Sequence, residues 1–173
     1  MLLFSNQVEA LRDFFESGGS VLWVILVVAI ILWSLIIERY WYVYITYPAY
    51  ADSLSRKWNG RADKHSWYAR QIREAWVSDV SSRLKGSLSY IGTLISICPL
   101  LGLLGTVTGM IHVFDVMAAT GTGNARAMAS GVSLATIPTM AGMVIALSAL
   151  YFRMHLNQKA EFEIRKLADE FSE

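Results

Sequence analysis

The chain has 173 residues, of which 54% are hydrophobic and 17% are charged. A chain of this length cannot bury that much apolar surface as one soluble domain, so soluble globular classes are excluded. The formal net charge of +1 gives no support to nucleic-acid binding. The single cysteine, Cys98, provides neither a disulfide framework nor a metal cluster, and we interpret it as a packing residue. We therefore predict an integral membrane protein.

The first segment, residues 3–15, has the pattern of an amphipathic helix, because its apolar residues recur at intervals of three or four. Two interpretations are open: a helix lying on the outer membrane surface, or a solvated helix that packs on neighbouring protein. Gly18 and Gly19 are expected to end this helix and to begin the turn into the membrane.

Three runs contain no Asp, Glu, Lys or Arg: residues 20–37, 88–114 and 127–152. Since about 20 residues cross a bilayer as a helix, each run predicts one transmembrane helix. The second and third runs exceed the thickness of the hydrocarbon, so we expect these helices to continue into the aqueous phase. No basic segment precedes the first run, which we expect to remain in the mature protein. The predicted fold class is an all-α membrane protein with three transmembrane helices and long cytoplasmic helical extensions.

The distribution of Lys and Arg predicts the orientation in the membrane. Residues 48–86 hold most of the basic side chains between the spans: Arg56, Lys57, Arg61, Lys64, Arg70, Arg73, Arg83 and Lys85. Only Arg12 precedes the first span, and only Arg126 lies between the second and third. The long connection and the C-terminus are therefore expected in the cytoplasm and the N-terminus on the outer side of the membrane. Aromatic residues crowd the inner end of the first span, as at a membrane interface: Tyr40, Trp41, Tyr42, Tyr44 and Tyr47.

The pattern divides the chain into seven segments. These are an outer amphipathic helix (1–19), transmembrane helix 1 (20–47), a cytoplasmic helical loop (48–87), transmembrane helix 2 (88–117), a short periplasmic loop (118–127), transmembrane helix 3 (128–153) and a cytoplasmic C-terminal helix (154–173). Apolar residues in the cytoplasmic loop recur at helical spacing and predict one packed face: Trp58, Trp67, Tyr68, Ile72, Trp76, Val80 and Leu84. The turn-forming connection between helices 2 and 3 predicts an antiparallel hairpin.

Small residues follow one face of each helix in this hairpin. Gly102, Gly105 and Gly109 lie three and four residues apart on helix 2, with Thr106 beside them. Helix 3 carries a second stripe: Ala135, Thr139, Gly142, Ala146 and Ala149. Such stripes let helix backbones approach closely, so helix packing is the simplest interpretation of the glycines.

The hydroxyls of the hairpin allow two interpretations. Ser and Thr in membrane helices often bond to a carbonyl one turn earlier, and we keep that interpretation for Thr108 and Ser133. Thr106 and Thr139 instead lie on or beside the small-residue stripes. There they can line a shared narrow space and offer donors and acceptors to water or to a protonatable group.

Two prolines interrupt the pattern of backbone donors. Pro138 lacks an amide hydrogen and crowds the carbonyl of Leu134, so helix 3 is expected to be kinked or loosened there. A free carbonyl would then lie near Thr136 and Thr139. Pro99 has the same effect in helix 2, and both prolines can equally be simple packing kinks.

The hairpin has no proton carrier of its own. Its two apolar runs contain no acidic or basic residue, and His112 is their only imidazole. A proton path through this chain alone would therefore lack a titratable group in mid-membrane. For His112 and Asp115, solvation at the interface and a role at the mouth of a path are both open. No HExxH or GxSxG motif and no intramembrane carboxylate pair is present, so we predict neither an enzyme nor a bound cofactor or metal.

The stretch 102–109, GLLGTVTG, closely resembles the second helix of the ExbB/TolQ/MotA proton-channel family. The likeness continues through 131–142, GVSLATIPTMAG, and the predicted topology of the whole chain is similar. The resemblance implies an ExbB-like subunit of a TonB energy-transducing complex in a Gram-negative inner membrane. In that family, five copies form a ring lined by helices 2 and 3, and the lumen holds single helices of an ExbD-like partner that carries an essential Asp.

Carried over by position, the resemblance makes three threonines candidates for lining a proton path beside the partner's carboxylate: Thr106, Thr136 and Thr139. Leu134 stands where relatives commonly have Glu, so a pore acid in this subunit is in doubt. Ser148 stands where they commonly have proline, which suggests that the kink has moved to Pro138.

Two alternative functions stay open. A TolQ-like subunit of the Tol-Pal envelope-integrity system would share the mechanism. A structural membrane scaffold without conductance would explain the small-residue packing, but it predicts that Thr106 and Thr139 tolerate valine. Because one chain exposes two small-residue stripes and three helices cannot enclose a lumen, we predict a cyclic homo-oligomer. The resemblance implies that this oligomer is a pentamer and that its partners are an ExbD-like and a TonB-like protein.

Overall fold

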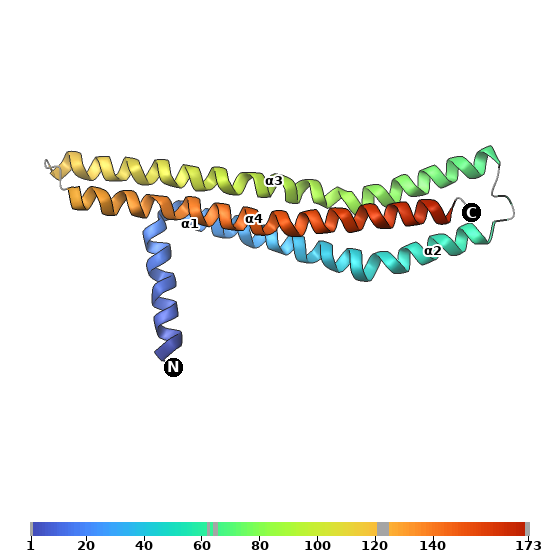
Figure 1. Cartoon of the computed structure of the whole chain (residues 1–173), viewed down its shortest axis with the longest axis horizontal. Coiled ribbons are helices and arrows are strands. Elements are labelled where there is room, and N and C mark those ends of the chain that lie inside the picture. Colours follow the sequence, from blue (N-terminus) through green and yellow to red (C-terminus); the bar gives the residue numbers. More distant parts are fainter. Residues whose placement is uncertain (1, 62, 64–65, 121–124, 172–173) are drawn as a thin grey trace. The chain divides into compact units, whose positions relative to one another are not determined.

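The structure is a computed structural model that describes residues 2–61, 63, 66–120 and 125–171, with side chains from residue 19 onward except 120, 125–127 and 130. The elements of this part are all helical: α1 (Leu2–Trp41), the π-helix η1 (Tyr42–Thr46), α2 (Tyr47–Asn59), α3 (Trp67–Thr120) and α4 (Ala125–Glu170) (Figure 1). Three stretches are long and apolar enough to cross a membrane: Gly19–Asn59, Trp67–Ala119 and Gly131–Glu170. The predicted all-α class with three long apolar helices is confirmed for the described residues.

The helix α1 is kinked at Gly19, which has φ 65° and ψ −167°. An L-residue rarely adopts a positive φ, whereas glycine does so without steric cost. The kink thus lies at the second glycine of the pair, Gly18 and Gly19, at which the first helix was predicted to end. The two interpretations of residues 3–15 both stay open, because the side chains of these residues lie outside the described part.

The helix α1 ends at Trp41 and is followed directly by η1 and then by α2. A π-turn inserts a residue relative to the α-helical register and so rotates the faces that follow it. Val43 and Tyr47 nevertheless remain buried, and Pro48 occupies the first turn of α2, where its missing amide hydrogen costs nothing.

The long helices α3 and α4 each run without interruption through a proline, Pro99 in α3 and Pro138 in α4. The predicted periplasmic loop, 118–127, overlaps both helices: residues 118–120 belong to α3 and residues 125–127 to α4, whereas residues 121–124 lie outside the described part.

The chain forms two compact units. Unit 1 comprises Met1–Leu32 and Leu94–Ser148. Its buried residues include Leu22 and Ile25 of α1, Cys98 of α3, and Ala135 and Ala146 of α4. Cys98 is fully buried, which confirms its interpretation as a packing residue.

Unit 2 comprises Trp33–Thr93 and Ala149–Glu173. Rings of α2, of α3 and of the residue that follows α4 meet in this unit: the ring centroid of Trp58 in α2 lies 6.2 Å from that of Trp76 in α3 and 5.1 Å from that of Phe171. The predicted packed face is correct for Trp58, Val80 and Leu84, which are buried. It is wrong for Trp67 and Tyr68, which are 65% and 72% exposed.

Candidate functional site in the α3–α4 hairpin

The glycines of the hairpin lie where α3 and α4 approach each other within unit 1. A Cβ placed on Gly102 would lie 2.8 Å from the Cα of Thr139, and one on Gly142 would lie 2.5 Å from the carbonyl oxygen of Cys98. A Cβ on Gly109 would lie 2.6 Å from that of Ala135. Real Cβ atoms do not approach backbone atoms this closely, so only glycine permits this separation of the helices.

Pro138 packs into the space that a glycine leaves open. A Cβ on Gly105 would collide with the Pro138 ring, and the Pro138 side chain is fully buried. The ring therefore acts as a knob that fits against α3. The helix α4 continues through this position, so the loosened backbone expected at Pro138 is not a break in the helix.

Thr139 joins the two helices. Its hydroxyl donates to the carbonyl oxygen of Gly102 at 2.8 Å, across the contact between the stripes. This bond forms because Gly102 has no side chain to shield its carbonyl from the neighbouring helix.

The other two candidate threonines bond within their own helices. The hydroxyl of Thr106 donates to the Leu103 carbonyl at 2.7 Å, and that of Thr136 donates to the Ser133 carbonyl at 2.7 Å. Thr108 donates to the carbonyls of Leu104 and Gly105, as predicted for it. Sequence pattern grouped Thr106 with Thr139, whereas in the structure only Thr139 reaches the opposite helix.

The hydroxyl hydrogens of all three candidate threonines are thus used in hydrogen bonds, but their hydroxyl oxygens can still accept hydrogen bonds. A hydroxyl has one hydrogen to donate and two lone pairs to accept with. A protonated carboxylic acid can donate to such an oxygen as it stands. A carboxylate needs the hydroxyl hydrogen, so the threonine must first rotate away from its carbonyl.

The two positions at which this chain departs from the family pattern, Leu134 and Ser148, both carry uncharged side chains. Leu134 is 41% exposed in the chain by itself and presents an apolar surface. Ser148 donates to the Ile145 carbonyl at 2.9 Å, within α4. The two apolar runs of the hairpin, residues 88–114 and 127–152, contain no Asp, Glu, Lys or Arg.

Two arginines that the sequence pattern did not single out bind main-chain carbonyls at the end of the apolar runs, within unit 2. Arg39, only 5% exposed, donates to the carbonyl of Arg83, and Arg153 donates to that of Leu88 at 3.2 Å. Gly92 leaves room for Arg153, because a Cβ there would lie 2.7 Å from its Nη2 atom. The sequence does show that both arginines lie within two residues of the end of an apolar run. It does not show which carbonyl each arginine binds, because that depends on the tertiary structure.

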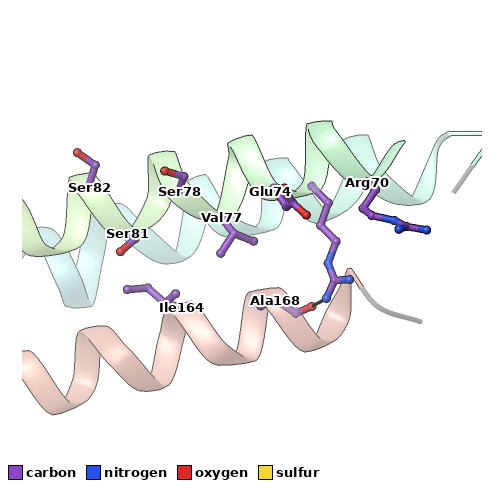
Figure 2. A pocket seen from close by; sticks show the side chains of 9 residues that line it. Arg70, Glu74, Val77, Ser78, Ser81, Ser82, Ile164 and Ala168 are labelled. Carbon is purple, nitrogen blue, oxygen red and sulfur yellow. Dashed lines mark hydrogen bonds between the residues drawn. The ribbon is translucent and has the colours of Figure 1, made fainter. Parts of the chain in front are cut away.

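A groove of about 690 Å³ lies between α3 and α4 in unit 2. Figure 2 shows side chains that line this groove, among them Arg70 and Glu74 of α3 and Ile164 of α4. The side chain of Arg73, also in the lining, donates to the carbonyl oxygen of Ala168 at 2.7 Å. The last carbonyls of a helix have no partner within that helix, so Arg73 satisfies one near the end of α4.

We expect Arg73→Ala to loosen the end of α4. A charge-assisted hydrogen bond contributes about 1 kcal/mol at a partly exposed site, so amide exchange over residues 165–171 should accelerate roughly fivefold. Hydrogen–deuterium exchange with mass spectrometry measures this rate. Arg70→Ala is the matched control, because Arg70 lines the same groove and its backbone amide donates to Ser66, whereas within the described residues its side chain caps no carbonyl of α4. Equal exchange in both variants would contradict a capping role for Arg73.

The fold and the site define a multi-pass helical membrane protein with a close-packed, hydroxyl-bearing and uncharged hairpin. The sequence profile of the MotA/TolQ/ExbB proton channel family matches residues 48–169. The chain belongs to this family.

Three relatives illustrate the similarity. An ExbB-like biopolymer transport protein of Synechocystis sp. is 29% identical over 86% of this chain and 71% of its own length. The biopolymer transport protein exbB1 of Vibrio cholerae is 32% identical over 60% of this chain and 47% of its own length. The Tol-Pal system protein TolQ of Pseudomonas aeruginosa is 31% identical over 60% of this chain and 46% of its own length. The chain thus spans about half the length of the last two.

Proposed function

We propose that this protein is the ExbB-like subunit of an inner-membrane motor driven by the proton motive force. With an ExbD-like partner, it would energise TonB-dependent import through the outer membrane, for example of iron–siderophore complexes or vitamins. The observation that carries the proposal is the hairpin itself, which presents Thr106, Thr136 and Thr139 within a charge-free span. Such a wall suits a carboxylate supplied by another chain.

The chemistry of the threonines suggests how proton binding would move the partner. A neutral carboxylic acid can donate to the hydroxyl oxygen of Thr139, while the Thr139 hydroxyl still donates to the Gly102 carbonyl. A charged carboxylate instead draws the hydroxyl hydrogen away from that carbonyl. The two protonation states of the partner's acid therefore favour different arrangements of the wall, which would bias the partner's helix between positions.

Assembly as a ring, most simply a pentamer, is part of the proposal. Large apolar side chains cover the outside of the hairpin, such as Leu103 and Val107 on α3 and Val144 and Leu147 on α4, all at least half exposed in the single chain. Three helices cannot enclose a lumen, so copies related by a rotation axis would have to surround the partner. The basic residues between α1 and α3 support a cytoplasmic location for that connection and for the C-terminus.

A second candidate is a TolQ-like subunit of an envelope-integrity system. It is favoured by the 31% identity to TolQ of Pseudomonas aeruginosa, which is close to the values for ExbB-like relatives. Both candidates use the same proton chemistry, whereas a non-conducting scaffold does not. Deletion of the gene distinguishes the first two: loss of TonB-dependent uptake supports an ExbB-like role, and detergent sensitivity with intact uptake supports a TolQ-like role.

Proton flux into liposomes tests the conducting function. A charge in mid-membrane costs several kcal/mol or more, and hydroxyls do not titrate in the useful range, so the protein alone should conduct no protons. Flux reported by a pH-sensitive dye should appear when a single-span partner with a membrane Asp is reconstituted with it.

The matched control is the same partner with its membrane Asp changed to Asn. This variant preserves the shape of the side chain but removes its titration. Flux from the protein without a partner, or flux that the Asn change leaves undiminished, would refute the proposal.

A further inference from the structure

The groove between α3 and α4 in unit 2 has a polar lining, only part of which the capping bond of Arg73 explains. Its volume of about 690 Å³ falls within the range of ligand sites in proteins. Val77 and Ile164 supply apolar surface, and charged and hydroxyl side chains of α3 supply much of the rest (Figure 2). Residues 70–82 and 164–168 lie outside the three charge-free runs, so the groove belongs to the part of the chain expected in water.

Two guanidinium groups belong to the α3 wall of this groove. Arg70 and Arg73 are three residues apart, so their side chains are neighbours on one face of the helix. Arg73 uses its Nη2 atom for the Ala168 carbonyl and keeps further N–H donors, since a guanidinium has five. Within the described residues, the Arg70 side chain makes no hydrogen bond or ion pair, not even with Glu74 one turn further on. Neighbouring guanidinium groups with donors to spare suit a phosphate group.

Three serines extend this wall along α3: Ser78, Ser81 and Ser82. Other helical hydroxyls of the chain, such as that of Ser148, donate to a carbonyl of their own helix. In the part of the chain that the structure describes, the hydroxyls of the three groove serines form no such bond. They can therefore donate to the oxygens of a ligand.

An exposed aromatic ring precedes the arginines on the same helix face. Trp67 lies three residues before Arg70 and seven before Glu74, which is the spacing of one face of an α-helix. Its ring packs on Tyr68 and is still 65% exposed. A flat, exposed ring beside cationic side chains is a surface on which a nucleobase can stack.

We propose that this groove binds a nucleoside triphosphate as its magnesium complex. The base would stack on Trp67, and the phosphates would lie between the two arginines and run on toward Ser78. Glu74 lies beside this path and would bind the magnesium ion, because Mg²⁺ is commonly held by one or two carboxylates together with the phosphates of a ligand. The inference does not depend on proton conduction or on the identity of a membrane partner.

The test is isothermal titration calorimetry of the full-length protein in lipid nanodiscs, with magnesium-bound ATP as the probe. Saturable binding with a Kd below about 1 mM is expected. Inorganic phosphate and adenosine should each bind at least roughly tenfold more weakly, because each makes only part of the contacts. No saturable binding would overturn the proposal, and would mean that another copy or a partner covers the groove or that it takes no ligand. Equal binding of inorganic phosphate would also overturn it, since the base would then contribute nothing.

Two pairs of variants locate the site. Arg70→Ala should weaken binding roughly tenfold through the loss of a charge-assisted hydrogen bond, whereas Arg56→Ala removes the same charge from an exposed position that does not line the groove. Trp67→Ala should weaken binding about fivefold or more, whereas Tyr68→Ala removes an exposed ring that lies off this face. Equal weakening within either pair would contradict a site in this groove.

Magnesium separates the proposed site from attraction to positive charge in general. ATP without magnesium carries more negative charge, so attraction to a basic surface alone favours the metal-free form. The proposed site instead favours magnesium-bound ATP by roughly fivefold, on the order of one net hydrogen bond. Glu74→Gln should remove this preference. Tighter binding of metal-free ATP to the unchanged protein, or a preference that survives Glu74→Gln, would overturn the proposal.

Discussion

Gly142→Ala is expected to destabilise the hairpin by about 1–3 kcal/mol, although alanine is normally the better helix residue. A Cβ at this position would lie 2.5 Å from the carbonyl oxygen of Cys98 and 3.2 Å from its carbonyl carbon. These are backbone atoms of α3, so no side-chain rotation relieves the collision and the two helices must separate. The separation would also lengthen the hydrogen bond from Thr139 to Gly102. Thermal unfolding in mild detergent, followed by circular dichroism, should show a melting temperature several degrees lower.

The matched control is Gly86→Ala. Gly86 lies within α3, is exposed, and a Cβ there meets no atom within 4 Å. Its substitution should therefore leave stability unchanged or raise it by about 0.5–1 kcal/mol through helix propensity. If both variants melt at the same temperature, the close approach of α3 and α4 at Gly142 does not hold the hairpin together.

Apolar periodicity and charge were sufficient to predict the main elements. Each of the three charge-free runs has about the length that a helix needs to cross a membrane, and a helix satisfies its own backbone hydrogen bonds there. The three spans therefore follow from composition. The kink at Gly19 follows from a glycine pair between two helical patterns. The π-helix at Tyr42–Thr46 was not predictable in this way, because a π-turn changes the backbone register and leaves no distinct side-chain period.

The exposed rings at Trp67 and Tyr68 show where periodicity fails. Both residues have the spacing of the packed face, but they lie in the first turn of α3. Arg73, about a turn and a half further on, already pairs with Ala168 near the end of α4. The helices run in opposite directions there, so the first turn of α3 extends past the part of α4 that would cover it. Instead the two rings pack on each other, 5.2 Å apart.

The candidate site was predictable as a pattern but not as a set of bonds. Both Thr106 and Thr139 lie on or beside stripes of small residues, and sequence gives them equal weight. Which of the two hydroxyls bonds to the other helix depends on which residue of that helix lies opposite it. Thr139 faces the bare backbone of Gly102, whereas Thr106 finds its nearest acceptor in its own preceding turn.

Thr139→Val is expected to abolish energy coupling while the protein still inserts and assembles. Valine has nearly the shape of threonine but neither donates nor accepts, so the Gly102 carbonyl loses the Thr139 donor and the partner's acid loses its hydroxyl. A hydrogen bond to a charged group contributes about 1.5–3 kcal/mol, which corresponds to roughly a 10- to 100-fold loss of proton flux with the partner present. Growth on an iron source that requires TonB-type uptake should fail in parallel.

Three further variants separate the hydroxyl from the packing. Thr139→Ser keeps the hydroxyl and should retain most of the flux, whereas a packing role would make the loss of the methyl group the more damaging change. Thr106→Val should also lose coupling, because its oxygen is a candidate acceptor for the partner's acid even though it donates within its own helix. Thr108→Val should do much less, since Thr108 bonds only to its own helix and is not a candidate pore residue. Equal flux in the three valine variants would leave the threonines with no role beyond packing, and the conducting function would lose its support.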